Sequence, residues 1–265
     1  GTASFVSDTG YVTFLKGARV DVSAVAGGDA GTLILQSVNG TVSLADGSVQ
    51  GANPEEDGVR GEGARVTIDT GSLASFSALN TALNTGGFDG SRELRVRTGD
   101  IEVLEDDVVK ADTVRIAADQ GALDIAGTID ASGVSAGHIA LFARDDVNLL
   151  STGKLLAAAS GVGEQGGDIE IGTEVGSLNL AAGSRVDLAS GAGGQGGMLR
   201  LHAPRVGNDV AVTALKGDIA GAASVSVEAT KVYDGITTLN ASGTSSGSTL
   251  TLAQINTDNA DFATH

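Results

Sequence analysis

The chain has no cysteine, no tryptophan and only two prolines among its 265 residues. Without cysteine, neither disulfide bonds nor thiol chemistry can contribute to its fold or its function. Aromatic residues make up only 3% of the sequence, although 41% of it is hydrophobic. The core must therefore be built from valine, leucine, isoleucine and alanine, which suit a narrow and regularly layered interior.

Basic residues are also scarce: 16 lysines and arginines stand against 33 aspartates and glutamates, a formal net charge of −17. Nucleic acids and anionic membrane surfaces attract positive charge, so we expect neither as a partner. No apolar run approaches the roughly 20 residues of a membrane span, so we expect none. The opening residues, GTASFVSDTG, lack the basic and apolar segments of a secretory signal. We expect the chain to be an internal piece of a longer protein.

Glycine is abundant, and glycine-rich stretches repeat along the chain. Forty glycines without a collagen-like period indicate many tight turns, and hence many short strands. The stretch GVGEQGG at Gly161 returns as GAGGQGG 30 residues later, at Gly191. The flanking residues repeat as well, and copies of the whole unit occupy residues 19–37, 128–143, 154–172 and 185–203. Self-similarity at such a period is the mark of a solenoid.

Within each period the apolar residues alternate with polar ones, as in IEI, LNL and VDL, which is the periodicity of β-strands. The clearest period has three short strands, at 169–171, 178–180 and 186–188. Coils begin near Leu33, Val66, Leu94, Val114, Ile139, Ile169, Leu199 and Val225. No helical pattern with caps is recognised. The sequence therefore predicts an all-β parallel β-helix of about eight three-strand coils, stacked about 4.8 Å apart.

The stretch GVGEQGG contains G-x-G-x-x-G, the spacing of dinucleotide-binding sites. Such a site needs a helix after the glycines, so that the helix N-terminus meets the phosphate. Here the residues after the glycines, DIEIG and MLRLHA, are predicted strands, and the match recurs one period later. We interpret it as a turn motif and expect no cofactor.

Other catalytic patterns are weak. GTSSG at 243–247 matches a nucleophile elbow and STGK at 151–154 matches S-x-x-K, but neither has the required structural context, so we assign no catalytic residue. His138, His202 and His265 show no metal-ligand spacing, so no metal site is expected. On a second face, Asn148 and Asn179 are expected to stack as a short ladder.

Two acidic pairs are candidates for acid–base chemistry in a polysaccharide lyase or hydrolase. They are Asp106 with Asp107 and Asp145 with Asp146. The alternative is that each pair caps a solvated turn at the corner between two strands. An enzyme would also need a cleft walled by long loops, which the short turns do not supply.

Several of the few arginines fall at outward positions on the first strand of successive coils. With an aromatic ring and a histidine they form the candidate binding face Arg95, Arg97, Arg115, Phe142, Arg200 and His202, with Glu170 among them. Such a face could bind an anionic or neutral glycan. The alternative is that these are ordinary solvent-facing positions.

The repeated turns, together with ATKVYDGITTLNASG at 229–243, resemble the large exoproteins of bacterial two-partner secretion, the filamentous haemagglutinin-like adhesins. The repeats cover residues 1–228, and KVYDGITT looks like the start of a YDG module that stays incomplete over 229–265. The secretion domain of this family, with its Asn-Pro motifs, is not evident, since NPEE at 53–56 matches it poorly.

The resemblance implies an adhesin exported through an outer-membrane transporter partner and folded outside the cell, at the bacterial surface, as a right-handed β-helix. We therefore expect a non-enzymatic structural and adhesive segment that acts in cell attachment, aggregation or biofilm. Exopolysaccharide or cell-surface glycan binding along the Arg95–His202 face is the second hypothesis. A polysaccharide-degrading enzyme that uses Asp145 or Asp107 is the third.

Overall fold

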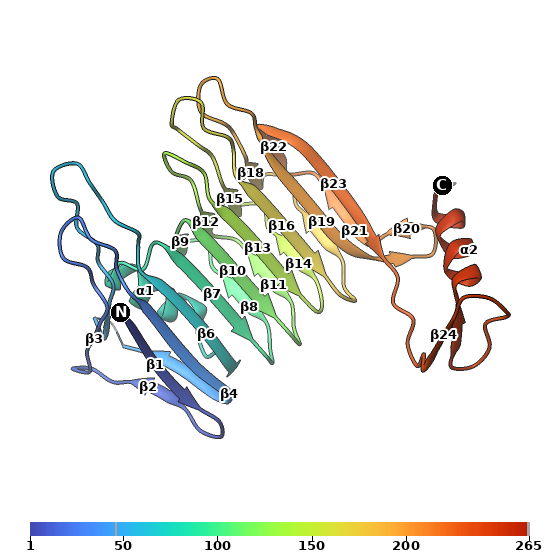
Figure 1. Ribbon diagram of the computed structural model, residues 1–265, viewed down its shortest axis with the longest axis horizontal. Helices are drawn as coiled ribbons and strands as arrows, with labels where there is room; N and C mark the ends of the chain where they lie inside the picture. Colours follow the sequence, from blue (N-terminus) through green and yellow to red (C-terminus); the bar gives the residue numbers. More distant parts are fainter. Residues whose placement is uncertain (46, 264–265) are drawn as a thin grey trace.

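The computed structural model describes residues 1–45 and 47–263, and its regular structure consists mainly of short parallel strands (Figure 1). The largest sheet has eleven strands in this part of the chain, in the order β1-β4-β6-β7-β10-β13-β16-β19-β20, with β2 paired to β4 and β23 to β19. Their bounds are β1 Thr2–Ser7, β2 Val12–Phe14, β4 Thr32–Leu44, β6 Arg65–Ser72, β7 Ser91–Val96, β10 Thr113–Ala118, β13 His138–Ala143, β16 Asp168–Thr173, β19 Gly197–Val206, β20 Asp209–Val210 and β23 Ala222–Thr230. All of these pairings are parallel except that of β19 with β20.

Two further sheets of five strands each are parallel throughout. The second sheet consists of β8 Ile101–Val103, β11 Leu123–Ile125, β14 Val147–Leu149, β17 Leu178–Leu180 and β21 Val212–Leu215. The third consists of β9 Val108–Lys110, β12 Thr128–Asp130, β15 Lys154–Leu156, β18 Arg185–Asp187 and β22 Asp218–Ala220. Two short pairs complete the strands: β3 Val20–Asp21 with β5 Val49–Gln50, and β24 Thr238–Asn240 with β25 Thr249–Thr251.

From β7 onward the chain visits the three sheets in turn. It passes through β7, β8 and β9 and then returns to the first sheet as β10, which pairs with β7. We call one such passage a period. Successive returns stay in register, so that Val114, Ile139, Ile169 and Leu199 lie opposite one another. The predicted all-β class with parallel strands is confirmed, and the strands fall where the alternating apolar residues predicted them.

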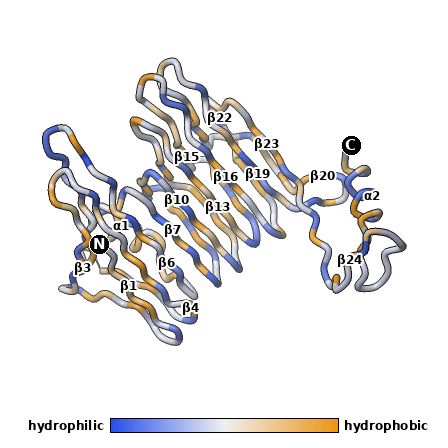
Figure 2. Tube along the Cα trace, viewed as in Figure 1, coloured by the Kyte–Doolittle hydropathy of each residue, from blue (hydrophilic) through white to orange (hydrophobic). Residues whose placement is uncertain are grey.

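Alternate residues of all three sheets point into one aliphatic core. Ile116, Ile125, Ile129, Leu141 and Leu149 are each at most 2% exposed. Figure 2 shows hydrophobic and hydrophilic residues alternating along the strands. Burial of apolar surface, at about 25 cal/mol per Å², therefore stabilises each period from β7 to β19. It falls off at β21, β22 and β23, which contain no buried residue.

One expectation was wrong, because a capped helix is present. The helix α1, Phe76–Gly86, begins after Ser75, whose hydroxyl accepts a hydrogen bond from the backbone N–H of Ala78, and ends at Gly87, where φ is 77°. Apolar side chains at Phe76, Leu79 and Leu83 form its buried stripe. These were the sequence signals for it: an N-cap serine, apolar residues three and four apart, and a C-terminal glycine.

The helix α1 takes the place of two strands. It lies between β6 and β7 in the chain, where other periods have strands of the second and third sheets, and it contacts β5, β8 and β9. A second helix, α2 Leu252–Ala263, lies near the C-terminal end. Figure 1 shows α2 apart from the stacked sheets and α1 among the N-terminal strands.

A buried arginine ties α1 to the first sheet. Arg92 of β7 lies opposite Val66 and Val114, a position that the sequence pattern reserves for an apolar residue. Its Nε donates to the carbonyl of Phe88 at 2.6 Å, and its Nη1 donates to Oδ1 of Asn80 at 3.0 Å. Burial lowers the pKa of Arg92 to about 10, so the guanidinium remains charged at neutral pH.

The repeated glycine turns bring the backbones of neighbouring periods into contact. A Cβ added at Gly191 would overlap the carbonyl oxygen of Gly161, and one added at Gly197 would overlap that of Gly167. Gly193, in the same turn, has a φ of 85° with open space around it. The strands β16 and β19 follow these turns, which confirms the predicted strand–turn–strand order.

The C-terminal segment is held to α2 by side chains of the KVYDG stretch. Asp258 Oδ2 accepts from Lys231 Nζ at 2.6 Å and from the Tyr233 hydroxyl at 2.5 Å. Arg205 of β19 donates to the backbone carbonyl of Asp258, and its guanidinium lies 5.0 Å from the ring centroid of Phe262. The predicted boundary at 228/229 falls within β23. The end of the predicted module, including His265, lies outside the described residues.

We expect Gly191→Ala to lower the free energy of unfolding by about 3 kcal/mol, because the neighbouring carbonyl must move to admit the new methyl group. Gly193→Ala is the matched control, since it adds only the cost of a left-handed alanine, about 1 kcal/mol. Urea unfolding followed by circular dichroism measures both. Equal losses would contradict the close backbone approach.

We expect the attachment of α2 to weaken in acid. Hydrogen bonds from Lys231 and Tyr233 lower the pKa of Asp258 to about 2. The ionised Asp258 therefore stabilises the attachment of α2 fully above about pH 4, and this stabilisation is lost as the pH falls through 2. Burial and the hydrogen bond to Asp258 raise the pKa of Tyr233 to about 12. The protonated Tyr233 therefore stabilises the attachment of α2 fully below about pH 10, and this stabilisation is lost as the pH rises through 12.

Two-dimensional NMR between pH 7 and pH 2 should show the amide signals of α2 shifting while those of β13 stay in place. Asp258→Asn should loosen α2 already at pH 7, as measured by amide hydrogen exchange. Asp234→Asn, which removes a nearby carboxylate with no ion pair in the described part of the chain, is the control. An unchanged α2 in both experiments would mean that Asp258 does not hold it.

Candidate functional site

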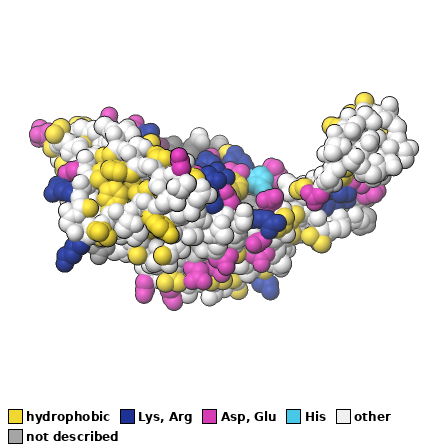
Figure 3. All heavy atoms as spheres, turned by 90° about the horizontal axis from the view of Figure 1, so that it is seen from below, with side chains coloured by type: hydrophobic (Ala, Val, Ile, Leu, Met, Phe, Trp, Pro, Cys, Tyr) yellow, Lys and Arg dark blue, Asp and Glu magenta, His cyan; other side chains and the backbone are white. Residues whose placement is uncertain are grey.

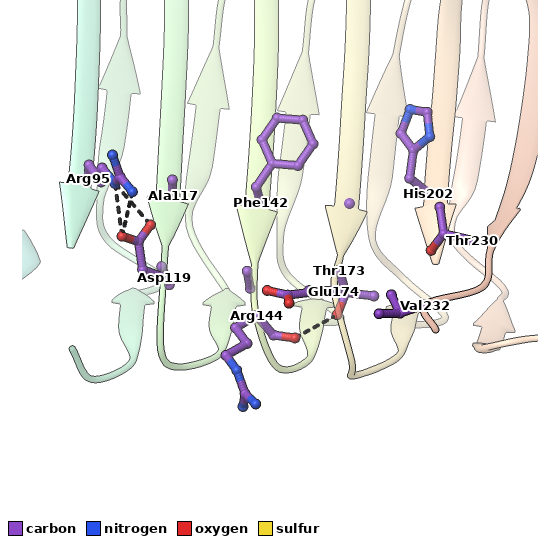
Figure 4. A pocket seen from close by; sticks show the side chains of 13 residues that line it. Arg95, Ala117, Asp119, Phe142, Arg144, Thr173, Glu174, His202, Thr230 and Val232 are labelled. Atoms are coloured by element: carbon purple, nitrogen blue, oxygen red, sulfur yellow. Dashed lines mark hydrogen bonds and ion pairs between the residues drawn. The ribbon is translucent and has the colours of Figure 1, made fainter. Parts of the chain in front are cut away.

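The outward face of the first sheet carries an open groove of about 670 Å³ (Figure 4). It crosses β10, β13 and β16 near the ends of these strands. Its lining consists of Arg95, Ala117, Ala118, Asp119, Phe142, Ala143, Arg144, Gly172, Thr173, Glu174, His202, Thr230 and Val232. We call this set the groove.

Strand register places the main groove residues in one row. Arg95 lies opposite Ala117, Ala117 opposite Phe142, and the row continues through Gly172 to His202. Each of these positions alternates with buried residues of the same strand, so the row faces outward. The groove is therefore a direct consequence of which residues occupy equivalent positions in successive periods.

The floor of the groove is an aromatic ring between two small residues. Phe142 is half-buried, and its neighbours Ala117 and Gly172 have no long side chain to cover it. A Cβ added at Gly172 would lie 2.7 Å from Cδ1 of Phe142, so the ring extends over the glycine. Figure 4 shows the ring with its flat face toward the viewer.

Paired charges occupy one end of the groove. The Nε of Arg95 donates to both carboxylate oxygens of Asp119, at 3.0 and 2.9 Å. This fork-like pair fixes the guanidinium in place while leaving both groups partly exposed.

At the other end, His202 lies between two glutamates. Its Nδ1 is 3.3 Å from Oε2 of Glu228, and its Nε2 is 3.0 Å from Oε1 of Glu170. The second contact is short but is not aligned as a hydrogen bond. The Nε2 atom is therefore buried without a hydrogen-bond partner among the described residues.

The rim beside the ring is formed by the residues that follow β13 and β16. Arg144 Nη1 lies 3.2 Å from Oδ1 of Asp145, and the Thr173 hydroxyl donates to the backbone carbonyl of Asp145 at 2.5 Å. Glu174 is exposed and makes no side-chain hydrogen bond or ion pair within the described residues. The lining thus has two guanidinium groups and two carboxylates, which balance, on a chain with a net charge of −17.

The structure divides the six candidate residues among different surroundings. Arg95, Phe142 and His202 line the groove. Arg97 forms a two-pronged pair with Asp69, with distances of 2.7 and 2.8 Å, and this pair raises the pKa of Arg97.

The remaining two arginines lie in the neighbouring row. Arg115 is opposite Glu93, and Arg200 is opposite Glu170. The neighbouring row therefore carries glutamates beside its arginines, and the candidate arginines do not form one cationic stripe. Figure 3 likewise shows acidic and basic side chains interspersed on the face that it draws.

Sequence reasoning missed Asp119, Arg144 and Glu174, which follow the strands rather than lying within them. Their signal is positional: each comes directly after the alternating run of a first-sheet strand, at β10, β13 and β16. Only the register shows that these three strand ends are adjacent.

One carboxylate of each acidic pair, Asp107 and Asp146, is engaged in hydrogen bonds. Asp107 is 8% exposed, and its Oδ2 accepts from the Ser77 hydroxyl at 2.6 Å and the Leu104 N–H at 2.9 Å. Asp146 accepts from the backbone N–H and the hydroxyl of Ser177. Only the Leu104 contact is a local turn bond, since Ser77 belongs to α1 and Ser177 to the next period. Asp107 is also buried, whereas the turn alternative expected a solvated carboxylate.

The other predicted features are placed as follows. Asn148 and Asn179 lie opposite one another as expected, but the Asn148 amide donates to Asp124 on the other side. The Ser245 hydroxyl is engaged with Thr251. Within residues 1–45 and 47–263, no cluster of three or more histidine or acidic side chains could hold a metal ion.

Comparisons with protein-family models, curated proteins and solved structures return no match for this chain. Neither helix in the described residues is long and apolar enough to cross a membrane.

We expect Arg97→Ala to lower the free energy of unfolding by about 0.5 to 1 kcal/mol, because it breaks the two-pronged pair with Asp69. Arg115→Ala, which removes an exposed guanidinium opposite Glu93, should change it by less than about 0.5 kcal/mol. Chemical unfolding of the two variants at low and high salt measures the difference. An equal loss of unfolding free energy in both variants would show that the Arg97–Asp69 pair stabilises the fold no more than the exposed Arg115 does.

Proposed function

We propose that the chain is a right-handed parallel β-helix of about eight coils, in one of which α1 replaces two strands, and that it serves as a non-enzymatic structural and adhesive segment of a secreted bacterial surface adhesin. The observation that carries the proposal is the order of the three parallel sheets, in which each period returns beside the strand of the period before it. The hand follows from the strong preference of parallel crossovers for a right-handed path.

The adhesin part of the proposal is supported by the sequence resemblance of the glycine turns and of KVYDGITT. The same resemblance supports a location outside the cell and an outer-membrane transporter as partner of the longer protein. A chain without cysteine also suits export in an unfolded and unlinked form.

The physical properties of the strands suit a projecting rod. Each period contacts mainly the one before and the one after it, so rigidity grows with the number of periods and needs no large globular core. The net charge of −17 keeps such rods soluble and apart.

The enzyme hypothesis lacks comparable support. Asp107 is committed to two hydrogen bonds, one from Ser77 of α1 and one from the backbone N–H of Leu104, and Asp145 faces Arg144. Neither carboxylate lies in the groove lining.

Display of the chain on a non-adhesive bacterium tests the proposed function. Cells that carry it through an outer-membrane anchor should settle or attach several-fold faster than cells that display an unrelated protein of equal length and net charge. Antibody labelling shows whether both proteins reach the surface. Equal settling at equal display would refute the adhesive role.

A further inference from the structure

We infer that the groove binds an uncharged oligosaccharide, with one sugar ring stacked on Phe142 and its neighbours lying across β10 and β16. This inference rests on the proposed adhesive function and names the ligand class of that function. It depends on the floor, the ends and the charge of the groove.

The floor is a stacking platform. Phe142 is one of only eight phenylalanine and tyrosine residues in the chain, and it faces outward in the middle of a sheet. The face of an aromatic ring is electron-rich and attracts C–H groups. A pyranose ring presents such C–H groups on its less polar face, so it can lie flat on the phenylalanine.

The two residues beside the ring leave it accessible. A glycine in the middle of a strand weakens it and often marks a place where a ligand approaches. Gly172, the second-last residue of β16, lets the ring lie low against the sheet, while Ala117 on the other side has only a methyl group. A longer side chain at either position would occupy the space over the ring.

The ends of the groove supply polar groups at the spacing of an oligosaccharide. Arg95 and His202 are each two strands away from Phe142, on opposite sides. At about 4.8 Å per strand, the distance between these two ends is about 20 Å. That length matches several linked sugars rather than one, and it runs along the stack of strands.

Sugar hydroxyls donate and accept hydrogen bonds, and the groove offers both functions. The Arg95–Asp119 pair presents N–H donors beside carboxylate oxygens. Glu174 adds an exposed carboxylate that makes no side-chain bond within the described residues. Pockets with an aromatic floor and a few fixed polar groups are typical of small-molecule sites.

Charge selects an uncharged ligand. Both groove arginines already face aspartates, Asp119 and Asp145, so neither has an unpaired guanidinium for a sugar carboxylate. The whole chain has a net charge of −17, which repels a polyanion at long range. The groove therefore favours a neutral glycan over an acidic one, which narrows the class that the sequence left open.

The test is titration of the purified chain with defined oligosaccharides, followed by NMR. The neutral probes are the trimers of β-1,4-linked and α-1,4-linked glucose, and the acidic probe is the trimer of galacturonic acid. We expect at least one neutral trimer to bind with a dissociation constant on the order of 1 mM, and to shift the ring signals of Phe142. With six phenylalanines, two tyrosines and no tryptophan, the aromatic spectrum is simple enough to assign.

Two variants and one control locate the site. Phe142→Ala should weaken binding at least tenfold, and Ala117→Gln should do the same by placing a long side chain beside the ring. Ala117→Gln leaves the ring itself in the chain, so it remains informative if Phe142→Ala unfolds. Arg115→Ala, in the neighbouring row, should bind as the unaltered chain does.

The inference is overturned if neither neutral trimer binds at 20 mM, if the acidic trimer binds more tightly, or if Ala117→Gln and Phe142→Ala bind as the unaltered chain does. Its failure is distinguishable from failure of the proposed function. If the cells still settle together but the groove binds no sugar, only the glycan site is refuted. If the groove binds sugar but the cells do not settle, only the adhesive role is refuted.

Discussion

The constraint on which the structure depends is that successive strands of the first sheet from β7 to β19, one period apart, pair in parallel and in register. This pairing satisfies the backbone hydrogen bonds and stacks equivalent side chains above one another. A slip of one residue would turn the aliphatic row of Ile139 and Ile169 out to solvent. The hydrophobic core and the outward rows are thus set together by a single choice of register.

Turns have to respect the same constraint. Because strands are fixed about 4.8 Å apart, the corners between them must also approach that closely. Where the chain folds back tightly, only glycine leaves room for the carbonyl of the neighbouring period, as Gly191 does beside Gly161. A spacing that elsewhere marks a nucleotide site is therefore produced here by backbone packing.

Sequence reasoning located the strands well because alternation of apolar residues is a local signal. It failed at α1, where the repeat is interrupted, because attention to the period hid an ordinary capped helix from Ser75 to Gly87. It also left unseen that Arg97 is paired with Asp69, which lies 28 residues away in the chain and opposite Arg95 in the sheet. Long-range partners of this kind depend on register, which no local pattern encodes.

The interrupted period also shows how the fold accommodates a polar core residue. With α1 in place of two strands, the interior beside β7 is wide enough for the side chain of Arg92, which a regular period would exclude. Its guanidinium finds acceptors at the carbonyl of Phe88 and the amide of Asn80, both supplied by the helix or by the residues just after it. A buried charge without such acceptors would be strongly unfavourable. The helix and the arginine are therefore mutually dependent, and a return of this segment to strands would require an apolar residue at position 92.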